Sequence, residues 1–123
     1  MIGRSTVSYL LFMTLGAGLP ATAHAQEVFK GIGSGFCHEF LEMRDLPETE
    51  SAFASWVYGF FTGSNLAFYS TANQTMRDLS GPELTPAALM ERVSADCEAD
   101  PKQQMLTVLA PIYADLPFHE LQN

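Results

Sequence analysis

The sequence predicts a small all-α domain of four helices pinned by one disulfide. Four segments space their apolar residues at helical intervals, and three of these begin at proline or capping signals. No segment shows a sustained period of two, so we expect no strands. The 123 residues contain only two cysteines. This length and cysteine count suit one small domain with a single bridge.

The first 25 residues are predicted to be a secretory signal peptide. Residues 1–4 give a short positive start, residues 7–19 are apolar and uncharged, and Ala23-His24-Ala25 is a small-x-small cleavage site. The apolar run stops at Pro20, so it is too short to cross a bilayer. Cleavage after Ala25 would leave residues 26–123 as one soluble domain, located in the periplasm or secreted.

Export determines how the cysteines are interpreted. In an oxidising compartment, Cys37 and Cys97 most simply form one structural disulfide. Closing this loop would stabilise the fold by roughly 4 kcal/mol, comparable to the whole stability of a small domain. A redox role is the alternative, but the sequence has no C-x-x-C spacing and no neighbouring base that would lower a thiol pKa.

The first helix is predicted over residues 35–44, after a glycine-rich segment. Residues 26–35 are expected to be a flexible lead-in, since no lysine follows that would indicate a phosphate-binding loop. Phe36, Cys37 and Phe40 then fall on one helical face.

The second helix is predicted over residues 47–69, beginning at a proline suited to a first turn. No charge stands between Glu50 and Arg77, and apolar residues surround most of the cylinder. We therefore expect this helix to be central and buried on most sides by the other three. The uncharged run 52–69 is also just long enough for a membrane span, but its polar residues and the lack of a flanking basic cluster favour a packed helix.

Within this helix, Trp56 is expected to be a buried core anchor that shares a face with Phe53 and Phe60. Gly59 and Gly63 have the G-x-x-x-G spacing. In water this spacing predicts the close approach of a packed neighbour beside Trp56.

The remaining chain is predicted to contain a loop and two helices. Residues 70–84 are rich in turn formers, with room for one short turn. The third helix starts at Thr85-Pro86 and has Cys97 at its end. The fourth starts at Asp100-Pro101 and continues to Ala110, because Pro111 forces a kink or a restart.

No constellation of residues predicts catalysis, so we expect no enzyme activity, metal or cofactor. His38 and His119 are far apart in the sequence and lack ligand spacing. Glu39 with Glu42 could act as a carboxylate pair, but a solvated helix surface explains both. A net charge of -8 without a basic cluster excludes nucleic-acid binding.

Three short motifs occur in order: CHEFL at 37–41, WVYGFFTGSN at 56–65 and CEADP at 97–101. Together they resemble the HdeA/HdeB-like family of small exported bacterial proteins, whose order is C-x-x-F-L, W-x-x-G-[YF]-x-x-G-x-N and C-x-x-[ND]-P. The cysteines of this chain are farther apart than in the best-known members. The candidates for core or interface positions are Phe40, Phe53, Trp56, Gly59, Phe60, Gly63 and Asn65.

The resemblance implies a helical domain pinned by the Cys37–Cys97 bridge. In the best-known members it also implies a periplasmic chaperone that is dimeric and idle at neutral pH. Acid splits and loosens such a protein, and the exposed apolar surface then binds unfolded periplasmic proteins.

The composition agrees with an acid-activated role. Near pH 2 to 3 most of the 14 carboxylates are protonated, so the net charge becomes positive. A disulfide would keep this acid state compact. Two alternatives remain: an immunity or inhibitor protein that binds one toxin or lytic enzyme, and an envelope interaction module without chaperone activity.

Overall fold

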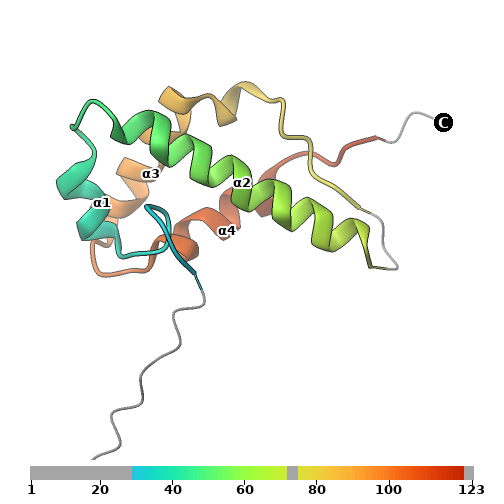
Figure 1. Ribbon diagram of the computed structural model, residues 1–123, viewed down its shortest axis with the longest axis horizontal. Helices are drawn as coiled ribbons and strands as arrows, with labels where there is room; N and C mark the ends of the chain where they lie inside the picture. Colours follow the sequence, from blue (N-terminus) through green and yellow to red (C-terminus); the bar gives the residue numbers. More distant parts are fainter. Residues whose placement is uncertain (1–28, 72–74, 121–123) are drawn as a thin grey trace, which may run out of the picture.

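The computed structural model describes residues 29–71 and 75–120, and this part of the chain is helical (Figure 1). Its elements are α1 (Cys37–Met43), α2 (Thr49–Tyr69), the short 3-10 helix η1 (Pro82–Leu84), α3 (Pro86–Ala99) and α4 (Met105–Asp115). These residues form no strand, only two isolated antiparallel bridges. The predicted all-α class with four α-helices is confirmed for the described part. The predicted leader, residues 1–25, lies outside it.

The helix against which the others pack is α3, not α2. It contacts α1, α2, η1 and α4. Phe53, Val57 and Phe61 are buried on one side of α2, and its other side is exposed. Up to residue 63 that exposed side carries small or hydroxyl-bearing residues, namely Ser51, Ser55, Gly59, Thr62 and Gly63, and large apolar residues are exposed only in the last turn of α2. The prediction of a central α2 buried on most sides is therefore wrong, because small uncharged residues can face water at little cost.

The core fills the space between the helices with apolar side chains. The rings of Phe40 and Phe53 pack with their centroids 4.8 Å apart, and those of Phe61 and Tyr113 are 5.3 Å apart. The other buried core residues include Val57, Leu84, Leu89, Val93, Met105, Val108, Leu109, Ile112 and Leu116. No helix within residues 29–71 and 75–120 is long and apolar enough to cross a membrane.

The predicted disulfide is confirmed. Cys37 of α1 is bonded to Cys97 of α3, and both residues are fully buried. With only seven residues, α1 is too short to be stable alone. Its first amides bind the turn after α3, since the Cys37 N–H donates to the Gln103 carbonyl and the His38 N–H donates to the Pro101 carbonyl, both at 2.9 Å. The bridge and these two bonds fix α1 on α3.

The start of α3 agrees with the prediction. Thr85 is its N-cap and accepts a hydrogen bond from the backbone N–H of Ala88, and Pro86 occupies the first helical position. The predicted start of α4 is wrong, because that helix begins at Met105. The Asp100 carboxylate instead accepts from the Lys102 N–H within a turn. This turn supplies the carbonyls that hold α1.

The predicted end of the fourth helix at Ala110 is also wrong, because α4 runs through Pro111 to Asp115 without a restart. Proline removes the hydrogen bond to the carbonyl four residues earlier, which here belongs to Thr107. Thr107 and Pro111 are both exposed. The freed carbonyl is on the solvent side of the helix, so water can satisfy it.

Candidate functional site

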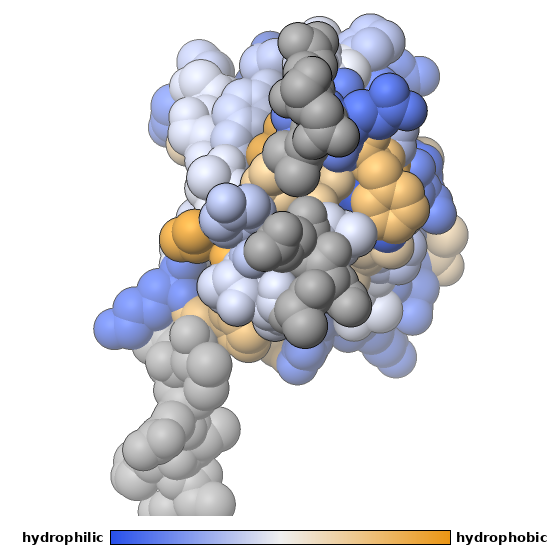
Figure 2. Space-filling view, turned by 90° about the vertical axis from the view of Figure 1, so that its right-hand side faces the viewer, coloured by the Kyte–Doolittle hydropathy of each residue, from blue (hydrophilic) through white to orange (hydrophobic). Residues whose placement is uncertain are grey.

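The end of the molecule farthest from α1 carries exposed apolar side chains. Leu66 is 67% exposed, Phe68 47%, Tyr69 49% and Phe118 59%. We call these four residues the apolar end. Figure 1 places it opposite α1, and Figure 2 looks onto this side and shows apolar groups among hydrophilic ones. Phe68 and Phe118 line one hollow there together with Arg77 and Tyr113, and exposed apolar groups that lie together are typical of binding surfaces.

Beside the apolar end, the side-chain amide of Asn65 joins three segments. Its Nδ2 donates to the Arg77 carbonyl over 2.9 Å, and its Oδ1 accepts from the Arg77 N–H over 2.7 Å. The same oxygen accepts from the Tyr113 hydroxyl over 2.8 Å. One side chain of α2 therefore holds both the chain after α2 and helix α4, and we call this arrangement the Asn65 clasp.

The C-terminal segment is paired with the chain that enters the clasp. The Asp78 N–H donates to the Pro117 carbonyl and the His119 N–H to the Met76 carbonyl, both at 2.8 Å. These bonds flank the bridge between Arg77 and Phe118. The Arg77 guanidinium also donates to the Leu116 carbonyl over 2.7 Å, and its Cζ lies 4.0 Å from the centre of the Phe118 ring. Residues 76–78 and 117–119 thus form one paired strap over α4.

One carboxylate and one phenol at this end have shifted pKa values. The hydroxyl and the backbone N–H of Ser80 both donate to the Asp78 carboxylate, at 2.6 and 2.9 Å. These bonds lower the pKa of Asp78, and His119 adds a smaller effect in the same direction. Burial raises the pKa of the Tyr113 phenol. The strap therefore includes a carboxylate that is stabilised in its charged form.

Trp56 is half-buried rather than fully buried, so it is only partly the core anchor that was expected. Its ring stacks on Phe60 with centroids 5.4 Å apart, and its Nε1 donates to the Lys30 carbonyl over 2.7 Å. The segment that covers it is a turn in which Ser34 donates twice to the Gly31 carbonyl. A Cβ at Gly31 or Gly33 would overlap the indole. Within the predicted flexible lead-in, residues 31–34 therefore form a defined turn, and residues 26–28 lie outside the described part of the chain.

The structure divides the other predicted positions into two groups. Phe40 and Phe53 are fully buried, and Phe60 is partly buried against the core. Gly59 and Gly63 are exposed, and a Cβ at either would meet no atom of the described residues within 4 Å. The predicted approach of a helix at these glycines is therefore wrong within this chain, because the neighbour of Trp56 comes from the N-terminal turn.

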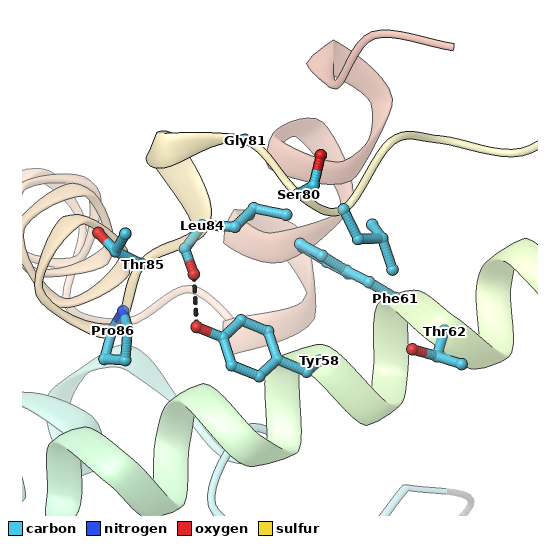
Figure 3. A pocket seen from close by; sticks show the side chains of 9 residues that line it. Tyr58, Phe61, Thr62, Ser80, Gly81, Leu84, Thr85 and Pro86 are labelled. Atoms are coloured by element: carbon cyan, nitrogen blue, oxygen red, sulfur yellow. Dashed lines mark hydrogen bonds between the residues drawn. The ribbon is translucent and has the colours of Figure 1, made fainter. Parts of the chain in front are cut away.

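A groove lies between α2 and the chain that leads into α3 (Figure 3). It has a volume of about 440 Å³. The Tyr58 hydroxyl donates to the Leu84 carbonyl over 2.5 Å and closes one end. Phe61 and Thr62 of α2 face the loop residues across it. We call this feature the Tyr58 groove.

The described part of the chain offers no three His, Cys, Asp or Glu side chains that could together hold a metal ion. His38 lies on α1 with its ring 5.9 Å from that of Phe36, and His119 lies in the strap. Glu39 accepts a hydrogen bond from the Phe36 N–H at the start of α1 over 2.7 Å, which is a capping role.

No family model, no curated protein and no solved structure matches this chain. Its function is therefore inferred from the geometry of the apolar end, the strap and the Tyr58 groove.

Sequence reasoning found Asn65 through its motif but missed its partners Arg77 and Tyr113. Arg77 was visible only as the first charge after a long uncharged run, and Tyr113 only as an apolar position of a helix. The contacts that give these residues their role join positions 12 and 48 residues apart. Local spacing carries no signal of such contacts.

Proposed function

We propose that this chain is an exported, HdeA/HdeB-like acid-stress protein that binds unfolded clients through apolar surface released at low pH. The observation that carries the proposal is the apolar end, where the exposed side chains of Phe68 and Phe118 lie beside a strap held mainly by hydrogen bonds. Detaching this strap would enlarge a surface that is already apolar.

Acid acts on the strap through Asp78. Its pKa is lowered in the folded chain, so its charged form stabilises the fold. That stabilisation is present at neutral pH and is lost as the pH falls through the lowered pKa. Protonation removes the charge that accepts the two hydrogen bonds from Ser80. These two bonds lie within residues 78–80, so their loss would loosen one segment of the strap, whose pairing itself rests on its backbone bonds and on Arg77.

Release of the strap would uncover aromatic side chains. Tyr113 is buried beside it, and the rings of Phe61 and Phe68 lie 5.3 and 6.1 Å from the Tyr113 ring. Aromatic rings supply large apolar contact areas to a bound partner. An opened apolar end could therefore bind the apolar segments of unfolded proteins.

Net charge favours opening in acid, and the disulfide limits it. Only two ion pairs join described residues, Arg44 with Glu98 and Arg92 with Asp96. Protonation of the carboxylates leaves the chain strongly positive, so the cations repel one another. The Cys37–Cys97 bridge keeps α1 on α3 far from the strap, so the loosened protein would stay compact.

Light scattering of an acid-labile client tests the proposal. The exported chain should suppress client aggregation at pH 2.5 and have no effect at pH 7. A Phe68→Ser, Phe118→Ser double variant should lose most of the suppression, whereas Ser51→Ala, on the exposed side of α2 away from the apolar end, should retain it. Client aggregation at pH 2.5 that the protein leaves unchanged would contradict the proposal.

A second function is favoured by the apolar residues exposed in the folded state. Leu66, Phe68 and Tyr69 are accessible without any opening of the strap. An immunity or inhibitor protein would use such a surface to bind one toxin or lytic enzyme at neutral pH. Tight one-to-one binding of a single enzyme at pH 7, without client protection in acid, would select this function.

A further inference from the structure

The Tyr58 groove forms because two side chains of α2 hold the following chain at two separated points. Asn65 binds the backbone of Arg77 and Tyr58 binds the carbonyl of Leu84. The two anchors are seven residues apart and so lie on the same face of α2. Between them, residues 79–81 arch over the helix and leave the space seen in Figure 3.

A small side chain on α2 keeps this space open. Thr62 stands where a larger side chain would fill it, whereas a Cβ at Gly81 would meet the Glu83 carboxylate outside the groove. Its volume of about 440 Å³ falls within the range of small-molecule sites. The Tyr58 hydrogen bond and the Thr85 cap fix the walls, so a ligand would meet a preformed site.

The charge around the groove indicates a neutral occupant. None of the nine lining residues is charged, although the chain carries 14 acidic and 6 basic side chains. The Asp78 and Glu83 carboxylates lie behind Ser80 and Gly81 and would repel an anion, and neither lines the groove, so a cation inside it would find no carboxylate to pair with. Burying either ion without a partner is costly.

The chemistry of the walls indicates an aromatic occupant with one hydrogen-bonding group. Leu79 and the Tyr58 ring give an accessible apolar lining, with Phe61 and Leu84 buried behind them. The Tyr58 hydroxyl already donates its proton to Leu84, so its oxygen can accept. A flat apolar ligand with one donor therefore complements the groove.

We propose that the Tyr58 groove binds one molecule of an uncharged aromatic compound that carries a hydrogen-bond donor. This binding takes place in the folded state at neutral pH, so it is separate from the acid-dependent surface at the apolar end. It uses different residues and does not require the strap to open.

Fluorescence titration with N-phenyl-1-naphthylamine tests the proposal, because this probe is neutral, aromatic and carries one N–H donor. The disulfide-intact exported chain at pH 7 should bind it saturably with one-to-one stoichiometry. Thr62→Phe should weaken binding at least about tenfold by filling the groove. Ser55→Phe adds the same side chain to the exposed side of α2 outside the groove, and should leave the affinity unchanged.

Amide NMR shifts locate the bound probe. The largest changes should fall in residues 58–62 and 79–86. Circular dichroism melting of both variants confirms that they fold. Absent or unsaturable binding, equal affinity of the Thr62→Phe and Ser55→Phe variants, or shifts centred on the apolar end would each overturn the proposal. A Phe68→Ser variant should retain the probe affinity, which separates this test from that of client binding.

Discussion

The hydroxyl of Tyr113 donates to Oδ1 of Asn65 across the interface of α2 and α4, over 2.8 Å. The same oxygen accepts from the Arg77 N–H, and Nδ2 of the same amide donates to the Arg77 carbonyl. The Asn65 amide thereby bonds to both the N–H and the carbonyl of Arg77, as the backbone of a neighbouring strand would. A single amide near the C-terminal end of α2 therefore holds both Arg77 of the strap and Tyr113 of α4.

Replacing Asn65 by alanine should lower the free energy of unfolding by about 2 to 3 kcal/mol. The change removes three hydrogen bonds and leaves the part-buried Tyr113 hydroxyl without its partner. Urea unfolding at pH 7 measures the effect. Ser64→Ala is the matched control, since the Ser64 hydroxyl bonds only to the Phe60 carbonyl of its own helix, and it should cost less than about 0.5 kcal/mol. An equal loss of unfolding free energy in the two variants would show that the Asn65 clasp does not stabilise the fold.

Two glycine substitutions should change stability in opposite directions. Gly33→Ala places a Cβ into the Trp56 ring and should destabilise by about 1 to 3 kcal/mol. Gly59→Ala meets open space within α2 and should stabilise by up to about 1 kcal/mol, because alanine favours helix more than glycine does. Thermal melting followed by circular dichroism compares them. A stabilising Gly33→Ala would show that the N-terminal turn does not cover Trp56.

The chain should contain no free thiol, and its stability should depend on the Cys37–Cys97 bridge. Alkylation without reductant, followed by mass spectrometry, should leave Cys37 and Cys97 unmodified. The Cys37→Ser, Cys97→Ser double variant should lose about 2 to 5 kcal/mol of stability. Substantial alkylation of the untreated protein would contradict a structural bridge.

Asp78→Asn should reduce the pH dependence of stability in acid. The lowered pKa of Asp78 means that its carboxylate stabilises the folded state at neutral pH and loses this effect as the pH falls. The variant should therefore be less stable than the natural chain at pH 7, and the difference should vanish by about pH 2. Urea unfolding across this range tests the sign, with the exposed Glu91→Gln as a control. A difference in unfolding free energy between the two chains that grows on acidification would contradict the prediction.

The sequence alone predicted those parts of the fold that depend on local signals. Thr85-Pro86 marks the start of α3 because the cap and the proline act within one turn. Cys37 and Cys97 were the only possible pair. Asp100-Pro101 gave a false helix start, because the same residues also suit a turn and the distant α1 selects the turn.

The candidate site was less predictable for a physical reason. Whether Gly59 faces a neighbour or water depends on which side of α2 the other helices occupy, and an uncharged helix does not encode that choice. The strap depends on backbone bonds between residues near 77 and near 118, which any side chain can make. The Tyr58 groove lies between the contacts that Tyr58 and Asn65 make with a distant segment, so the local sequence pattern does not predict it.

In the proposed function, acid detaches the strap and thereby exposes the client-binding surface. Arg77 and Phe118 face each other in an antiparallel pair, a geometry that brings Cα atoms close enough for a disulfide. An Arg77→Cys, Phe118→Cys double variant would lock the strap when oxidised. An Arg77→Ser, Phe118→Ser variant removes the same side chains without locking it.

Light scattering at pH 2.5 measures how far each of the two double variants suppresses the aggregation of an acid-labile client. We predict that the oxidised cysteine variant leaves client aggregation nearly unchanged, whereas the serine variant, which keeps Leu66, Phe68 and Tyr69, suppresses it. Equal suppression by the locked and the unlocked chains would contradict the claim that the strap must open.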